Sequence, residues 1–149
     1  MKIKPTGKHG IFADRDKPEL KSPRRARAAL PILILYAQRS DTITFRELAD
    51  AIAAPDMINR TMSPILDCIN TELENLSEHS SWQHGDIPTL TTIVVVGSGE
   101  PSAWMCEQMR EQMGVEPTKE NYERYLVKPV HEYEYWKEVI NEIIQSPNW

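Results

Sequence analysis

Apolar residues recur every three or four positions along much of the chain, which is the spacing of amphipathic helices. The clearest stripe follows Ser63-Pro64, a serine cap and a proline, and predicts a helix that runs to about Glu78. Its members are Ile65, Leu66, Ile69, Leu73 and Leu76. Further helices are predicted at about 23–39, 45–54, 101–113, 119–126 and 132–145. Pro31 should kink or split the first of these, and Pro129 should end the one before the last.

Two segments have the composition of strands. Residues 90–96 are rich in β-branched side chains, and residues 42–44 form a shorter segment of the same type. Thr44 and Glu47 then have the spacing of a capping box, which predicts the start of a helix. We therefore expect a helix-rich α+β fold.

The length of 149 residues predicts one domain. Residues 1–21 contain Pro5, Gly7, Gly10 and Pro18 with little periodicity, so we interpret them as a basic N-terminal arm. Residues 22–149 would form the single domain, in which 30–105 is one part and 106–149 is a helical extension. Ile11 and Phe12 are the residues of the arm expected to tuck against the core.

Charge is distributed unevenly between these parts. Residues 1–30 hold nine Lys and Arg against three Asp and Glu, a net charge of +6, and the other residues have a net charge of −11. An acidic body repels nucleic acid and attracts basic proteins, whereas a basic arm does the reverse. The arm can also fold back on its own acidic body or stay mobile, and the sequence leaves these alternatives open.

The centre of the chain carries several short motifs in a defined order. They are T-I-T-F-R-E-L-A at 42–49, a helix after Pro64, I-P-T-L at 87–90 and an apolar segment that ends at Gly97. This order resembles the winged-helix DNA-binding domain of alkylguanine-DNA alkyltransferases and alkyltransferase-like proteins, and that of small defence-associated helix-turn-helix domains. The resemblance covers about half the chain and implies a winged-helix-like centre over 30–105.

The chain departs from the family in its chemistry. The alkyltransferases carry a reactive cysteine in a Pro-Cys-His-Arg motif, where this chain has Pro88-Thr89-Leu90, so alkyl transfer is not implied. The helix in the recognition position, 63–78, has four carboxylates and no Lys or Arg. Cations that neutralise phosphates supply most DNA affinity, and an acidic helix lacks that contribution.

The acidic body favours a non-catalytic binding protein that docks on a basic protein partner, of the immunity, antitoxin or accessory type and possibly serving a nuclease. Opposite charge would steer the encounter between the two proteins, and an exposed tryptophan is a common interface anchor. The candidate protein-binding residues are Asp67, Glu72, Glu74, Glu78, Trp82 and Asp86.

Two other function classes remain open. One is a winged-helix DNA-binding protein of a bacterial defence or mobile-element system, in which the basic arm grips phosphate. Its candidate residues are Lys2, Lys4, Lys8, Arg24, Arg25, Arg27, Arg46 and Arg60. The other is an enzyme that uses Cys106 as a nucleophile beside the glycine turn at 97–99.

The sequence predicts no cofactor, no metal and no membrane partner. His79 and His84 lack the convergent ligands that zinc needs. No apolar run approaches the roughly 20 residues of a membrane span, and no apolar stretch follows the first lysines as in a secretory signal. We therefore expect a cytoplasmic protein with both cysteines reduced, and we leave its oligomeric state open.

Overall fold

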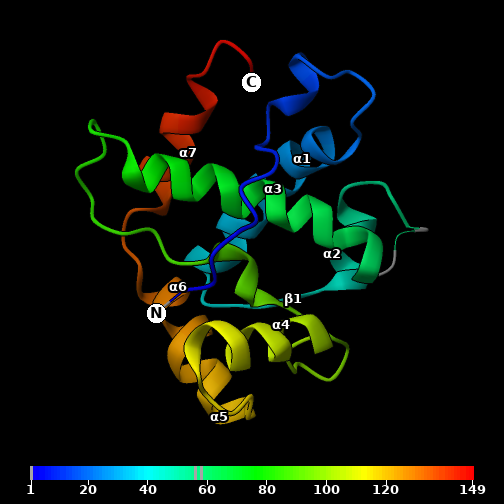
Figure 1. Cartoon of the computed structure of the whole chain (residues 1–149), viewed down its shortest axis with the longest axis vertical. Helices are drawn as coiled ribbons and strands as arrows, with labels where there is room; N and C mark the ends of the chain where they lie inside the picture. Colours follow the sequence, from blue (N-terminus) through cyan, green and yellow to red (C-terminus); the bar gives the residue numbers. More distant parts are fainter. Residues whose placement is uncertain (1, 56, 58) are drawn as a thin grey trace.

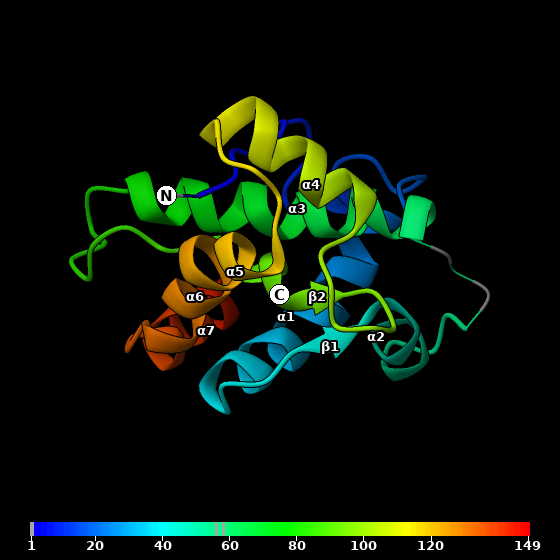
Figure 2. The same cartoon turned by 90° about the horizontal axis from the view of Figure 1, so that it is seen from below.

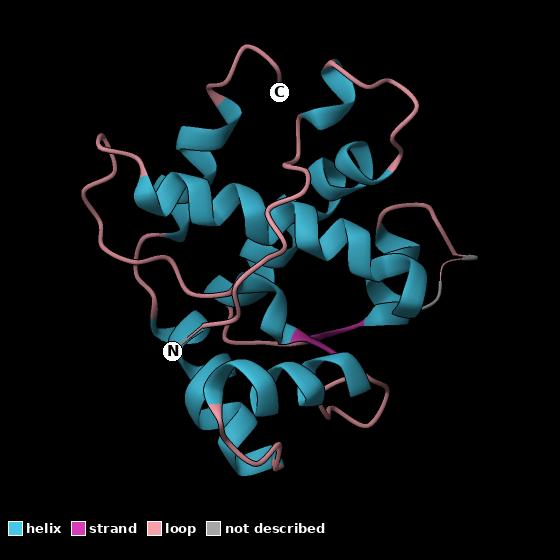
Figure 3. Ribbon diagram, viewed as in Figure 1, coloured by secondary structure: helices cyan, strands magenta, loops and turns pink. Residues whose placement is uncertain are grey.

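The computed structural model describes residues 2–55, 57 and 59–149, except for the side chains of residues 59–61. Helices dominate the chain, and one short pair of strands accompanies them (Figure 3). The predicted helix-rich α+β class is confirmed. Within the described residues, no helix has both the length and the apolar character needed to cross a membrane.

Two long helices, α1 (Ser22–Gln38) and α3 (Asn59–Glu78), pack against each other at the centre (Figures 1 and 2). The predicted apolar stripe of α3 is confirmed, since Ile65, Ile69 and Leu73 are buried. The helix begins earlier than predicted, however, and Pro64 lies inside it rather than at its start. Pro64 is the sixth residue of the helix, past the first four unpaired N–H groups, so it removes one intrahelical hydrogen bond.

Helix α1 continues through Pro31, so of the kink or split predicted at this proline the split is wrong. The Pro31 ring faces solvent, while Leu30 and Leu33 on the other side are fully buried. We infer that their packing holds the helix together across the missing backbone hydrogen bond. The segment is less uniformly buried than its composition indicates, because Leu35 is 43% exposed.

The sheet consists of β1 (Ile43–Thr44) and β2 (Val94–Val95), which pair in parallel with Ile43 opposite Val94. The strand predicted over 90–96 is wrong at its beginning, where Leu90–Ile93 forms a 3₁₀ turn. The hydroxyl of Thr91 donates to Asn70 Oδ1 and that of Thr92 to the carbonyl of Leu126. The turn is buried on all sides, and burial selects the same apolar and β-branched residues as a strand does.

The passage from β1 into the next helix is as predicted. Helix α2 (Phe45–Ala51) begins with the capping box, in which the Thr44 hydroxyl accepts from Glu47 N and the Glu47 carboxylate accepts from Thr44 N. The box fixes Phe45 at the first position of the helix, beside β1. Its ring can therefore contribute to the surface between α2 and β2.

The C-terminal part is a series of short helices, in which a π-helical turn follows α4 and another joins α5 to α6. In chain order these are α4 (Ala103–Gln108), the π turn Met109–Met113, α5 (Lys119–Tyr122), the π turn Glu123–Val127, α6 (Lys128–Glu132) and α7 (Trp136–Ile144). Pro129 does not break the helical path as predicted, since the π turn Glu123–Val127 runs directly into α6 and Pro129 is the second residue of α6. On α7, Ile143 is buried and Ile144 is 44% exposed.

The N-terminal arm lies across α3, where it forms part of the folded body (Figure 1). Ile3 and Ile11 are buried in the core, and Phe12 packs partly against it as predicted. Of the alternatives left open by the sequence, the structure therefore has the arm folded back on the acidic body.

Candidate functional site

The acidic residues predicted to dock a partner fall into two groups in the structure. Asp67, Glu72 and Glu74 lie on the part of α3 that the arm crosses, and each of them contacts the arm. Glu78, Trp82 and Asp86 lie at the C-terminal end of α3 and in the loop that follows it. Only the second group is largely available to another molecule.

Lys2 joins the arm to the body through two carboxylates. Its Nζ lies 2.7 Å from Glu74 Oε2 and 2.7 Å from Asp86 Oδ1. Burial lowers the pKa of Lys2, but the hydrogen bonds that its ammonium donates to Asp86 and Glu74, with their negative charges, outweigh this effect and the pKa is raised. The same contact lowers the pKa of Asp86 against the effect of its own burial. Asp86 still exposes 73% of its side chain, so it can serve a partner as well.

Asp67 and Glu72 meet the arm through its backbone. Thr6 donates its backbone N–H (2.9 Å) and its hydroxyl (2.5 Å) to the two oxygens of Asp67. Glu72 is half-buried, and burial raises its pKa although the backbone of Ile11 hydrogen-bonds its carboxylate. Gly10 fits against Glu72 so closely that an added Cβ would lie 2.8 Å from Oε2. These two carboxylates hold the arm in place.

Arg27 fastens the far end of the arm. Its guanidinium binds both oxygens of Asp14 (2.5 and 2.9 Å) and the carbonyl of Ile11 (2.5 Å). The hydrogen bond from Arg27 is the main reason that the pKa of Asp14 is lowered. Two of the cations proposed for DNA, Lys2 and Arg27, are thus engaged inside the protein.

The other predicted DNA contacts are scattered over several elements. Lys4 and Lys8 are exposed on the arm, Arg24 on α1 and Arg46 on α2. Arg25 Nη1 lies 3.6 Å from Met57 Sδ. The side chain of Arg60 lies outside the described residues.

An aromatic cluster, made of Trp82, His84, Tyr133 and Tyr135, stands beside the available acidic residues. Trp82 and His84 meet edge to face with ring centroids 4.9 Å apart, and His84 stacks on Tyr135 at 4.4 Å. Tyr133 contacts Tyr135 at 5.7 Å. The loop is held by the Trp82 indole, which donates to the carbonyl of Gly85 (2.8 Å). The sequence singled out Trp82 but missed its ring partners, because two of them lie some 50 residues further along the chain.

The surroundings of the aromatic cluster are acidic. Tyr133 has its pKa raised to about 12, by burial first and then by the negative charges of Glu138 and Asp86. Glu134 lies between the two tyrosines and is exposed, as is Glu78 at the end of α3. Tyr135 itself is 37% exposed. The cluster therefore combines partly exposed aromatic rings with nearby carboxylates.

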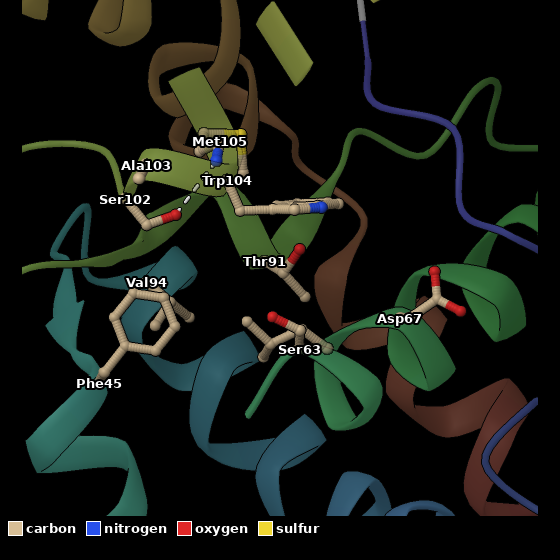
Figure 4. Close-up of a pocket in the computed structure, with 10 residues that line it drawn as sticks. Phe45, Ser63, Asp67, Thr91, Val94, Ser102, Ala103, Trp104 and Met105 are labelled. Carbon is tan, nitrogen blue, oxygen red and sulfur yellow. Dashed lines mark hydrogen bonds between the residues drawn. The ribbon is translucent and has the colours of Figure 1, made fainter. Parts of the chain in front are cut away.

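A second feature, which we call the Trp104 pocket, has a volume of about 270 Å³. It lies between the start of α2, the first half of α3, β2 and α4 (Figure 4). It is lined by Phe45, Ser63, Leu66, Asp67, Thr91, Val94, Ser102, Ala103, Trp104 and Met105. The sequence did not predict this pocket. One signal was present: buried Met105 and Met109 are four residues apart on one face of the α4 segment, which turns the neighbouring Trp104 away from the core.

The two cysteines lie in different surroundings. Cys68 is buried, and burial raises its thiol pKa to about 11, which disfavours the thiolate. Cys106 is half-buried, with Sγ 4.0 Å from the carbonyl oxygen of Pro101. The described residues contain no group of three or more His, Cys, Asp or Glu side chains arranged to hold a metal ion.

Comparisons with protein families, with curated proteins and with solved structures give no match to this chain. The geometry of the aromatic cluster and of the Trp104 pocket is therefore the basis for the proposals that follow.

Proposed function

We propose that this chain is a non-catalytic binding protein of the cytoplasm that docks a basic protein partner, in the manner of an immunity, antitoxin or accessory protein. The observation that carries the proposal is the aromatic cluster with Glu78, Asp86 and Glu134 around it. Tryptophan and tyrosine are enriched among residues that dominate binding energy. Carboxylates beside them attract cations, and aromatic faces bind Lys and Arg side chains.

The arm refines which acidic residues would take part. Asp67, Glu72 and Glu74 already hold Thr6, Ile11 and Lys2, so a partner would have to displace a segment anchored by two buried isoleucines. Glu78 needs no such displacement because it is exposed, and Asp86 exposes 73% of its side chain although its Oδ1 binds Lys2. We therefore place the docking surface at the aromatic cluster rather than along the whole of α3.

We propose further that residues 30–105 form a winged-helix-like centre, with 106–149 as its helical extension. The order α1, β1, α2, α3, β2 supports this, since it is the order that the sequence resemblance implies. In this arrangement the acidic α3 takes the position of a recognition helix, and the arm covers part of it. A fold of this kind can be retained for protein contacts after DNA binding is lost.

The test is affinity capture from the native host with two variants of matched charge. Glu78→Lys with Glu134→Lys reverses charge at the aromatic cluster, and Glu107→Lys with Glu111→Lys makes the same change at exposed positions on the α4 segment. We expect a basic protein to be retained by the wild type and by the second variant. The first variant should fail to retain this basic protein. When the partner has been purified, its dissociation constant for the first variant should be at least tenfold higher than for the wild type.

The winged-helix DNA-binding alternative makes a different prediction. Nuclease-sensitive DNA would be retained instead, and charge reversal to lysine would strengthen the binding rather than weaken it, with a steep dependence on salt. Retention of the same protein by both variants would also contradict the proposed surface.

A further inference from the structure

The Trp104 pocket is apolar inside and has one charged side chain at its edge. Phe45, Val94 and Met105 supply apolar walls, and Leu66 comes from α3. Figure 4 shows Phe45 and Val94 on one side and Asp67 on the opposite side, with the indole of Trp104 extending between them. The volume of about 270 Å³ is just below the 300–1,000 Å³ typical of drug-sized ligands, so it suits a molecule with a single ring.

Trp104 is 41% exposed although it adjoins this apolar surface. An indole that does not close the pocket leaves ring surface available to a ligand. Tryptophan is also the side chain that binds cations best through its ring face.

Hydrogen bonds hold the Asp67 side chain in place at the edge of the pocket. The two hydrogen bonds from Thr6 fix its carboxylate, and a carboxylate has about four acceptor positions, so further donors can bind. Among the described residues Asp67 has no ion-pair partner. No Lys or Arg of the described part of the chain lines the pocket itself.

Beyond Trp104 and Asp67 the surface opens into a wider polar groove. This groove is lined by Lys2, Lys4, Thr6 and Gln108, among others. Lys2 is already bound to Glu74 and Asp86. Asp67 thus stands at the boundary between an apolar pocket and a more open groove, where the charged head of an amphipathic ligand would keep most of its hydration while its apolar body is buried.

We propose that the Trp104 pocket is a binding site for a small organic cation, an amine with one apolar ring. The ring would lie against Phe45, Val94 and Met105, and the ammonium would meet the Asp67 carboxylate and the face of Trp104. This site is separate from the proposed docking surface, because Glu78 lies eleven residues after Asp67, about 16 Å along the axis of α3. The failure of one proposal leaves the other unaffected.

The experiment follows the indole N–H resonance of Trp104 by NMR, assigned with Trp104→Phe, during titration with three matched probes. These are phenethylammonium, neutral 2-phenylethanol and anionic 3-phenylpropionate. We expect the cation to shift this resonance and to bind at least tenfold more tightly than the anion, with the alcohol between them.

Three variants separate charge from structure. Asp67→Asn should remove the difference between cation and anion, whereas Thr6→Ala loses a hydrogen bond to Asp67 but keeps its charge and should retain the preference. Ala103→Leu, at an exposed position that lines the pocket, should fill it and weaken all three probes at least tenfold. The resonances of the other indoles report whether each variant remains folded.

Several outcomes would overturn the proposal. They are an unshifted Trp104 resonance with all three probes, equal affinity for cation and anion, or undiminished binding by Ala103→Leu. Tighter binding of acetyl-arginine-amide than of phenethylammonium would overturn it in favour of a side chain from a protein partner.

Discussion

At the scale of single residues, Glu72 shows how the arm and the acidic body hold each other. Its carboxyl is half-buried under the arm and its pKa is raised by that burial. Gly10 is the residue that lets the backbone come so near. A carboxylate in this position costs free energy when it is charged, so Glu72 makes the folded state sensitive to pH.

The sign of this pH dependence follows from the raised pKa. The folded state binds the Glu72 proton more tightly than the unfolded state, so this carboxyl contributes most stability below its ordinary pKa of 4.5 and loses it as pH rises through the folded value. Glu72→Gln cannot titrate but can still accept a hydrogen bond from the arm. The free energy of unfolding of Glu72→Gln relative to wild type should therefore increase from pH 4 towards pH 7, as measured by urea denaturation.

The matched control is Glu78→Gln, because Glu78 is exposed on the same helix. Its difference from wild type should stay flat over the same pH range. A falling difference for Glu72→Gln would show that Glu72 stabilises the fold as a charged group, against this account.

At the scale of elements, the arm is a structural part of the domain. Ile3 is 2% exposed and Ile11 is fully buried, so the arm contributes side chains to the same core as α1 and α3. Lys2, Thr6 and the Arg27–Asp14 pair add polar contacts along its length. Removing the arm would unfold or loosen the body, and loss of binding on arm deletion would not by itself indicate a nucleic-acid contact.

Ile11→Ala tests this role of the arm. It removes a buried side chain and leaves a cavity, which should lower the free energy of unfolding by about 2–5 kcal/mol. The measurement is chemical denaturation, with Leu35→Ala as the control because Leu35 is 43% exposed. For the control we expect the free energy of unfolding to fall by less than about 1 kcal/mol. Equal small losses for the two variants would mean that the arm is not part of the core.

Local signals in the sequence predicted the elements well where they act within a few residues. The Thr44–Glu47 capping box is as expected, and the helix predicted at 119–126 begins at Lys119. The prediction of local structure failed where contacts with segments distant in the sequence determine it. The 3₁₀ turn at Leu90–Ile93 depends on Asn70 and Leu126, and neither is adjacent in the sequence.

The same distinction applies to the candidate site. Charge counting identified carboxylates on α3 and in the following loop, but it could not show that the arm engages Asp67, Glu72 and Glu74. Trp82 was identified from its place in a polar loop, whereas Tyr135 joins it only through the folding of the C-terminal helices.

At the scale of the whole molecule, the ion pairs that join arm and body among the described residues are those of Lys2 with Glu74 and Asp86. What remains accessible is divided between two ends of α3. The aromatic cluster with its carboxylates marks one end, and the Trp104 pocket marks the other. This division leads us to place the protein partner at the first and a small cation at the second.

The most direct test of the central claim is site-specific photo-crosslinking in the host. A benzophenone side chain replaces Tyr135 in one variant and Leu35, an equally exposed position on α1, in another. The account predicts a covalent adduct with one basic protein from position 135 and none from position 35. Adducts from position 35 alone, or from neither position while the partner is still captured, would contradict docking at the aromatic cluster.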